Sequence, residues 1–380
     1  MADVHGTCDD RFGAVRRLLR DNLDSGAELG VSLVVDIDGE RGVDLWGGFR
    51  DEDQTIPWTA DTITNVWSST KTVTSLAALM LIDRGELDPA APVAKYWPEF
   101  AANGKQDVTV SHIMSHTSGV SGLEHPAVIA DLYDWEQATA RMAAQAPWWP
   151  PGTASGYHAL NYGHLVGEVI RRVTGQSLRQ FVAAEIAGPL GADFQIGAAE
   201  EDWPRIADVV PPPPLPFDLS ALDPASPVYK TFTGPVADAG AANTPGWRRA
   251  DIGAANGHGN ARSVARVMSV LSRGGEVDGV RLLSPATIDL VFREQSNGMD
   301  LVLGVPMRFG LGYGLPRPEV LPWAVHEKVC FWGGWGGSVI IMDAGRRMTF
   351  AYMMNKMGSG VVGSERSSGY GKAVFDAVRG

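Results

Sequence analysis

Ser68 and Lys71 are the residues whose types and spacing most directly suggest chemistry. A serine hydroxyl becomes a good nucleophile only when a neighbouring base takes its proton. Residues three apart on a helix share one face, so the Lys71 amine can reach the Ser68 hydroxyl if a helix begins here. A serine at a helix N-terminus also has free backbone N–H groups beside it, which suit a developing oxyanion. Taken alone, the S-x-x-K pattern also fits an ordinary helix start.

Three later segments contain residues that fit the same chemistry. They are Thr109–Gly119 (TVSHIMSHTSG), Pro151–Tyr157 (PGTASGY) and Phe331–Ser338 (FWGGWGGS). With the S-x-x-K pattern they resemble, in order and spacing, the motifs of class C β-lactamases and family VIII carboxylesterases. The resemblance spans roughly residues 60–355, which is most of the chain.

The resemblance implies roles for four residues. Ser68 would attack a carbonyl carbon and form an acyl-enzyme. Tyr157, its pKa lowered from about 10 by the Lys71 cation, would act as general base and then protonate the leaving group. The backbone N–H groups of Ser68 and Trp335 would form the oxyanion hole. Whether Lys71 or Tyr157 holds the proton is a property of the pair and stays open at this point.

Two departures from the β-lactamase pattern concern the substrate. Tyr157-His158-Ala159 stands where class C β-lactamases have Y-x-N, so the asparagine that holds a substrate amide is missing, although Asn161 is near in sequence. Trp332 stands where they have the lysine of K-T-G, and an indole cannot pair with a carboxylate. Both departures favour neutral acyl esters. Besides Trp335 and Trp149, the residues that we expect in the substrate pocket are Trp332, Gly333, Gly334, His158, Trp148 and Asn161, and residues 204–235 should shape it.

Other chemistries find less support. His112 and His116 are four apart and could face one metal ion, but no third ligand suggests itself, so local polar structure is the better interpretation. His158 lies next to Tyr157, but the resembled family does not use that position as a base. The chain has no G-x-S-x-G and no G-x-x-x-x-G-K-[ST]. We therefore expect no metal and no cofactor.

The elements that must hold these residues follow from hydrophobic periodicity and turn signals. An extended segment, Ile63–Val66, leads into a helix over Ser69–Asp83. Two β-hairpins are predicted, Val31–Asp36 with Val43–Trp46 around Asp38-Gly39, and Gly337–Met342 with Met348–Met354 around Asp343-Ala344-Gly345. Pro211–Pro216 is predicted to be a loop. Further helices are predicted over Asp10–Asp24, Val110–Met114, Trp135–Ala144, Asn161–Val173 ending at Gly175, Leu178–Ile186, Ala261–Leu271 and Ser367–Val378.

This order predicts an α/β (α+β) fold of the β-lactamase type, with an antiparallel sheet flanked by helices. Residues 1–70 and 240–380 would form an α/β lobe from both chain ends. Residues 71–239 would form an inserted, mainly helical lobe, with the active site between the two lobes.

Composition narrows the setting. The formal net charge of −12, without a Lys/Arg run, argues against nucleic-acid binding. The two cysteines, Cys8 and Cys330, form no disulfide framework and fit a reducing compartment. No apolar leader and no stretch of about 18 apolar residues is present, so we expect a cytoplasmic protein with no membrane partner. The sequence does not fix the oligomeric state.

The resulting functional prediction is a serine carboxylesterase acting on small-molecule esters with short to medium acyl chains through an acyl-Ser68 intermediate. An acyltransferase, an amide hydrolase or a β-lactamase of the same fold is the alternative. A non-catalytic binding protein is the second alternative, which the retention of both Ser68 and Lys71 disfavours.

Overall fold

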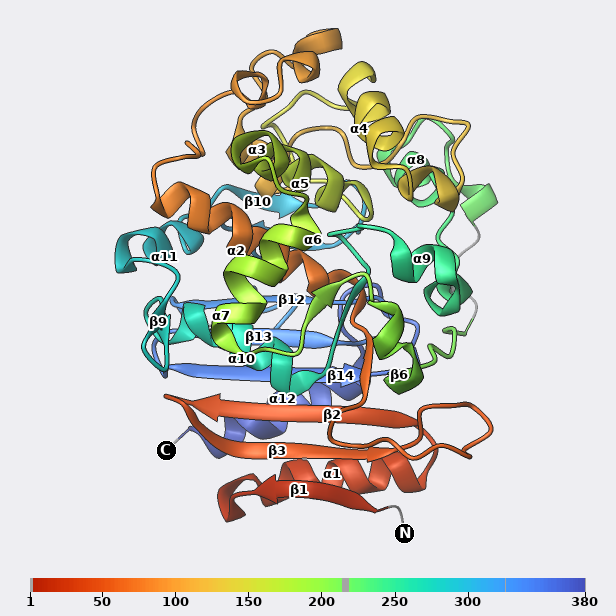
Figure 1. Cartoon of the computed structure of the whole chain (residues 1–380), viewed down its shortest axis with the longest axis vertical. Coiled ribbons are helices and arrows are strands. Elements are labelled where there is room, and N and C mark those ends of the chain that lie inside the picture. Colours follow the sequence, from red (N-terminus) through yellow and green to blue (C-terminus); the bar gives the residue numbers. More distant parts are fainter. Residues whose placement is uncertain (1–2, 214–218, 325, 380) are drawn as a thin grey trace.

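The fold is built around a six-stranded antiparallel sheet to which both ends of the chain contribute (Figure 1). The computed structural model describes residues 3–213, 219–324 and 326–379. The strand order is β1-β3-β2-β14-β13-β12, so the first three strands pair with the last three through β2 and β14. These strands are β1 (Val4–Cys8), β2 (Gly30–Ile37), β3 (Glu40–Gly48), β12 (Val329–Gly333), β13 (Val339–Asp343) and β14 (Met348–Met354).

Both predicted hairpins are present, and their turns explain them. Asp38 and Gly39 between β2 and β3 have φ values of 54° and 92°. Two successive residues with positive φ make the tight turn whose twist matches antiparallel strands. The hairpin of β13 and β14 pairs Asp343 with Met348 next to its turn, and every residue of both strands is buried. Strands buried on both faces need a helical layer on each side.

Helices cover the two faces of the sheet (Figure 1). Helix α10 (Ala261–Ser272) packs on β14, β2 and β13. Helices α1 (Gly13–Asp24) and α12 (Glu365–Ala377) contact each other and cover the opposite face. The predicted amphipathic helix near the N-terminus and the last predicted helix are therefore both present.

The middle of the chain is mainly helical. Helix α2 (Thr70–Asp83) is buried from Thr70 to Leu81, and it packs against α5 (Asn161–Thr174), which ends at Gly175 in the left-handed conformation. The predicted helix over Leu178–Ile186 is in fact divided into α6 (Leu178–Phe181), a π-helical turn η6 (Val182–Ala187) and α7 (Gly188–Leu190). The other helices are α3 (Val110–Met114), α4 (Trp135–Ala144), α8 (Pro227–Thr233), α9 (Pro245–Arg249) and α11 (Pro285–Val291).

Smaller sheets join the helical part to the large sheet. A four-stranded sheet with the order β5-β7-β4-β6 places β4, which precedes Ser68, next to β7. A hairpin of β10 and β11 and one of β8 and β9 complete the strands. Their bounds are β4 (Ile63–Asn65), β5 (Gln195–Ile196), β6 (Ile206–Ala207), β7 (Gly257–Gly259), β8 (Glu276–Val277), β9 (Val280–Arg281), β10 (Ser296–Met299) and β11 (Pro306–Phe309).

The predicted fold class is confirmed, because an antiparallel sheet made by both chain ends carries a mainly helical insertion. The lobe boundaries at residues 70 and 240 remain a prediction. Of the predicted proline-rich loop, residues 211–213 have no regular secondary structure and residues 214–216 lie outside the described residues. Within the described ranges, no helix is long and apolar enough to cross a bilayer.

Candidate active site

Ser68 lies in a sharp turn between a strand and the buried helix α2. Strand β4 ends at Asn65, and a 3₁₀ turn, η2 (Trp67–Ser69), leads directly into α2. Trp67 has a φ of 50°, which is rare for a bulky residue and marks local backbone strain. The Val66 N–H donates to the carbonyl of Gly257 in β7 at 2.8 Å, which holds the turn to the small sheet. Ser68 is thereby presented at the very start of the helix, as the sequence predicted.

Lys71 is one turn further along and points at Ser68. Its Nζ lies 2.9 Å from Ser68 Oγ and 3.0 Å from Tyr157 Oη. It also donates to the backbone carbonyls of Ala159, at 2.7 Å, and Ala254, at 2.9 Å. Of the nitrogen's four tetrahedral positions, one is the bond to Cε and two face carbonyl groups, which can only accept hydrogen bonds. The remaining position toward Ser68 and Tyr157 holds an N–H if the amine is charged and a lone pair if it is neutral.

Burial favours the neutral form of the Lys71 amine over the charged form. Lys71 is only 2% exposed, and burial lowers its pKa well below 10.5. The pKa of Tyr157 is raised, again mainly by burial, with smaller lowering contributions from Ser68 and Trp332. The direction is opposite to the lowering that we expected from a Lys71 cation, because desolvation of the buried phenol is the largest contribution to its pKa. Burial therefore favours the neutral form of both groups, the amine of Lys71 and the phenol of Tyr157.

Tyr157 is held in register from both ends. Its backbone N–H donates to Asp300 Oδ1 at 3.0 Å, and its phenol Oη lies 2.6 Å from Ser68 Oγ. Behind the ring are His116 and Trp332, with centroids 5.3 Å from that of Tyr157 in each case. Because these rings are themselves buried, the phenol can approach Ser68 from one direction only.

Two backbone N–H groups beside Ser68 suit an oxyanion. Ser68 is the second residue of its 3₁₀ turn, so its N–H has no partner within that turn. Trp335 follows the W-G-G triplet, and no described residue accepts a hydrogen bond from its N–H. A Cβ on Gly334 would lie 2.6 Å from the Val66 carbonyl oxygen, so only glycine permits this approach of the two segments. Ser338 Oγ donates to the same carbonyl at 2.9 Å and fixes the approach.

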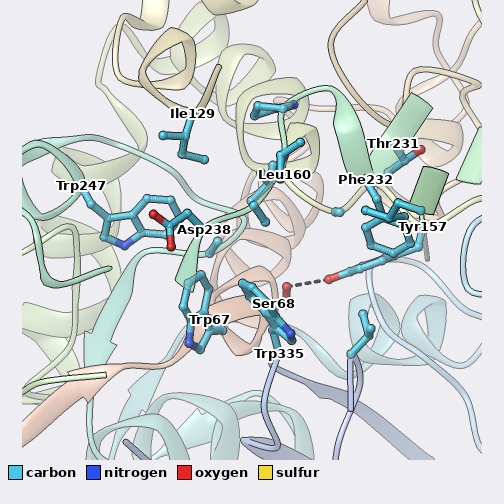
Figure 2. A pocket seen from close by; sticks show the side chains of 17 residues that line it. Trp67, Ser68, Ile129, Tyr157, Leu160, Thr231, Phe232, Asp238, Trp247 and Trp335 are labelled. Atoms are coloured by element: carbon cyan, nitrogen blue, oxygen red, sulfur yellow. Dashed lines mark hydrogen bonds between the residues drawn. The ribbon is translucent and has the colours of Figure 1, made fainter. Parts of the chain in front are cut away.

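A cavity of about 150 Å³ opens above these groups (Figure 2). Ser68 and Tyr157 form its polar floor, and Trp335 forms part of its wall. The rest of the wall is almost entirely apolar, with Asp238 as its one charged residue among those described. Other lining residues are Trp67, Ile129, Leu160, Leu219, Thr231, Phe232, Pro235, Trp247 and Val361. The expected contribution of the segment 204–235 is seen at four of these positions, between Leu219 and Pro235.

Seven residues predicted to line the pocket are not among those that line it. Trp332 is a strand residue, and its indole packs behind Tyr157 between His116 and Phe309. Its Nε1 has no hydrogen bond of ordinary geometry among the described residues. Gly333 and Gly334 are buried where β12 ends, with Gly334 donating to the Ser338 carbonyl. The predictions for these three residues are corrected, because strand β12 directs the side chain of Trp332 into the core and the two glycines that follow it are buried.

The other corrected residues lie at helix and loop positions. His158 is fully buried, 2.6 Å from Ser118 Oγ, and burial lowers its pKa to about 4. Trp148 lies against the ammonium of Lys230, outside the cavity lining. Asn161 begins α5 and is fully buried, with neither side-chain polar atom hydrogen-bonded to a described residue. The nearby Trp149, also expected at the pocket, is buried and donates to the Ala154 carbonyl.

Several residues in the wall of the active-site cavity were not predicted from the sequence. Trp67 immediately precedes the nucleophile, and its ring contacts those of Trp247 and Trp335 at 5.5 and 5.1 Å, so its position in sequence was a usable signal. Trp247 and Phe232 come from short helices in a segment without clear periodicity, and nothing in the sequence marks them. Ala159 and Ala254 act through their carbonyl groups, which sequence does not distinguish.

The histidines considered as metal ligands have other partners. His112 Nδ1 accepts from the Thr109 N–H at the start of α3, and His116 Nδ1 accepts from the His158 N–H. In the part of the chain that the structure describes, no group of three or more His, Cys, Asp or Glu side chains is arranged to hold a metal ion.

Comparison with known proteins agrees with this geometry. A family model described as Beta-lactamase matches residues 15–371. "Esterase/beta-lactamase LipL" of Mycobacterium tuberculosis is 35% identical over 99% of this chain and 88% of its own length. A crystal structure of a family VIII carboxylesterase superimposes with a TM-score of 0.92 at 38% identity, covering 99% of this chain and 100% of that one. A penicillin-binding protein homologue from Caulobacter crescentus gives 0.90 at 38% identity, with the same coverage.

The family match spans most of the chain, and the 35% identical relative is covered nearly end to end. The four motif segments, the sheet made by both chain ends and the Ser68–Lys71–Tyr157 cluster all fall inside the matched region. The chain belongs to the beta-lactamase family.

Proposed function

We propose that this protein is a serine carboxylesterase that hydrolyses esters with short to medium acyl chains through an acyl-Ser68 intermediate. The observation that carries the proposal is the contact of Ser68 Oγ with two buried proton-transfer groups, Lys71 Nζ at 2.9 Å and Tyr157 Oη at 2.6 Å. The full-length similarity to a family VIII carboxylesterase supports the same activity.

The proton pathway follows from the neutral pair. Ser68 Oγ attacks the ester carbonyl carbon while its proton passes to the Lys71 lone pair, and the carbonyl oxygen becomes an oxyanion held by the N–H groups of Ser68 and Trp335. As the C–O bond to the alcohol breaks, Tyr157 gives its proton to the leaving oxygen and regains one from Lys71. Water then attacks the acyl-enzyme by the same route in reverse.

The wall of the cavity favours a neutral substrate. It contains no Lys or Arg among the described lining residues, and its one charged residue is the carboxylate of Asp238. A β-lactam carboxylate would meet no cation there, and Trp332 in the K-T-G position is buried behind Tyr157. An uncharged ester with apolar substituents matches this wall by simple burial of apolar area.

We also propose a cellular location and a division of the chain into lobes. Cys8 and Cys330 are both free, which supports the predicted cytoplasmic location. We also retain the proposed division into an α/β lobe of residues 1–70 and 240–380 and a helical lobe of 71–239.

The activity is tested by assaying wild type and Ser68→Ala with p-nitrophenyl acetate, butyrate and octanoate, and with nitrocefin. We expect ester turnover by wild type and a loss of at least about 1,000-fold in Ser68→Ala. Nitrocefin turnover comparable to ester turnover would instead make the protein a β-lactamase. Absence of turnover on all four compounds, together with no labelling by a fluorophosphonate, would favour a binding protein.

A further inference from the structure

A second cavity lies next to the active site and shares a wall with it. It measures about 280 Å³, against about 150 Å³ for the cavity above Ser68. Phe232 and Val361 line both cavities, so the two are neighbours across these side chains. Every described residue that lines the second cavity is apolar; the others include Val302, Leu303, Val305 and Met307. We call this space the side compartment.

The side compartment is built on the same loop that positions Tyr157. This loop joins β10 to β11, and its Asp300 accepts hydrogen bonds from the backbone N–H groups of Tyr157, Val302 and Leu303. The Leu301 N–H donates to the Ser155 carbonyl at 2.9 Å. A wall tied to the catalytic tyrosine in this way keeps a fixed distance from the reacting atoms.

Apolar surface that faces water is stabilised when an apolar group covers it. Val305 is 44% exposed, so one side of the compartment is open to solvent, and the compartment has no polar side chain to orient a charged or hydrogen-bonding ligand. Its chemistry fits an aliphatic group that is attached to something already held at Ser68.

The side of Ser68 on which the compartment lies decides which part of an ester enters it. In the view of Figure 2, Phe232 and Tyr157 lie to one side of Ser68, whereas Trp247 and Asp238 lie to the other, and all four line the active-site cavity. A general acid must be within hydrogen-bond reach of the oxygen that it protonates, so the leaving alcohol lies on the Tyr157 side. The acyl group is then directed toward Trp67 and Trp247.

We propose that the side compartment binds the alcohol part of the ester, and that the preferred substrates are esters of long aliphatic alcohols with short acyl groups. The proposal rests on the carboxylesterase function and adds the substrate class. Each methylene that moves from water into the compartment should raise kcat/KM by up to about fourfold. The gain ends when the compartment is full.

Isomeric esters separate the two ends of the substrate. Octyl acetate and ethyl octanoate have the same atoms, and their hydrolysis is followed by titrating the acid released, with ethyl acetate and butyl acetate as shorter references. For wild type we expect kcat/KM to rise roughly 10- to 100-fold from butyl to octyl acetate, and octyl acetate to exceed ethyl octanoate. A wild type that gains nothing from a longer alcohol, or that prefers ethyl octanoate, overturns the proposal.

Filling the compartment is the second arm. Val320→Trp and, independently, Val305→Trp, both at residues that line the compartment, should lower kcat/KM for octyl acetate at least about tenfold and leave that for ethyl acetate within about twofold. Met299→Trp is the matched control, because Met299 is 58% exposed, belongs to the same hairpin and does not line the compartment.

Retained ethyl acetate turnover shows that each variant is folded and that the Ser68 chemistry is intact. If both filled variants keep the full octyl acetate advantage, or lose ethyl octanoate instead, the alcohol does not enter the compartment. Because Ser68-dependent hydrolysis of ethyl acetate is measured alongside, failure of this proposal is distinguishable from failure of the esterase function.

Discussion

At the scale of single residues, the reactivity of the site depends on a buried lysine that has no carboxylate partner among the described residues. Lys71 Nζ donates two hydrogen bonds, to the carbonyls of Ala159 and Ala254, and burial lowers its pKa well below 10.5, which favours a lone pair in the position that faces Ser68. An amine in this state can accept the Ser68 proton, which an ordinary surface lysine cannot do.

The pH dependence of kcat/KM should report this lysine. Its pKa is lowered, so the active, unprotonated form is present above that lowered pKa and is lost as the pH falls through it. We therefore expect an acidic limb with an apparent pKa far below 10.5, measured with p-nitrophenyl butyrate at constant ionic strength. Lys71→Arg, whose guanidinium stays charged, should be about 100- to 10,000-fold slower at every pH. A wild-type rate that keeps rising up to pH 10 would contradict a neutral Lys71.

Tyr157 should matter most when the leaving group needs a proton. In Tyr157→Phe the phenol that lies 2.6 Å from Ser68 Oγ is gone, while the ring can keep its packing on His116 and Trp332. We expect kcat for ethyl butyrate to fall about 100- to 10,000-fold, and kcat for p-nitrophenyl butyrate to fall much less, because p-nitrophenolate leaves without protonation.

The control for this variant is Tyr162→Phe. Tyr162 is also fully buried, but its hydroxyl lies 2.6 Å from Ser75 and makes no contact with Ser68. Tyr162→Phe should lose some stability without changing the ratio of kcat for ethyl butyrate to kcat for p-nitrophenyl butyrate. An equal loss on both esters in Tyr157→Phe would show that the phenol does not protonate the alcohol.

At the scale of elements, the site depends on how closely α5 approaches the segment that holds the Lys71 amine. A Cβ on Gly163 would lie 2.3 Å from the backbone nitrogen of Ala254 and 2.5 Å from the carbonyl carbon of Gly253. These are backbone atoms, so no side chain can rotate away. Ala254 accepts from Lys71, and the Gly253 carbonyl accepts from Thr74 of α2, so a shift here reaches the catalytic helix.

Gly163→Ala should therefore destabilise the protein by about 1–3 kcal/mol and lower kcat/KM, although alanine favours helix. Urea unfolding and ester turnover measure the two effects. Gly369→Ala is the matched helical control, because its Cβ meets only Leu18 Cδ2 at 3.4 Å, and it should be neutral or stabilising by up to about 1 kcal/mol. Equal behaviour of the two variants would mean that the approach at Gly163 does not constrain the site.

The same scale separates what sequence can predict from what it cannot. Local signals located β2 and β3 through Asp38-Gly39 and the end of α5 through Gly175, and the spacing of Ser68 and Lys71 predicted their contact. The direction of Trp332 depends on which face of β12 meets the Tyr157 ring, and periodicity does not say which residues will cover a fully buried strand.

The walls of the active-site cavity and of the side compartment come from separate parts of the chain. Phe232, Leu303 and Val361 meet only after the whole chain has folded, so no local pattern predicts them. Likewise, the pKa of Tyr157 depends on burial, which reversed the shift expected from its charged neighbour alone.

At the scale of the whole molecule, the two ends of the chain are joined by a buried polar cluster as well as by the sheet. Glu28, just before β2, accepts from Tyr352 Oη of β14 at 2.6 Å and from Tyr370 Oη of α12 at 3.2 Å. Arg366 of α12 lies 2.5 Å from the other carboxylate oxygen. The Glu28 side chain is 0% exposed and that of Arg366 is 13% exposed. Arg366 also donates to the carbonyls of Ala27 and Lys356, whereas the Glu28 carboxylate depends on the cluster for its compensation after leaving water.

Removing one charge of this cluster should weaken the whole fold. In Glu28→Ala, Arg366 and two buried phenols lose their shared acceptor, so we expect the free energy of unfolding in urea to fall by about 3–5 kcal/mol. The free energy of unfolding of Arg366→Ala should fall by a similar amount. The double variant should lose less than the sum of the two single losses, because the second change removes a group that the first left unpaired. The exposed pair of Arg347 and Asp38, 46% and 59% exposed, is the control, and Arg347→Ala should cost less than about 1 kcal/mol. Additive losses in the double variant would show that Glu28 and Arg366 do not act as a coupled pair.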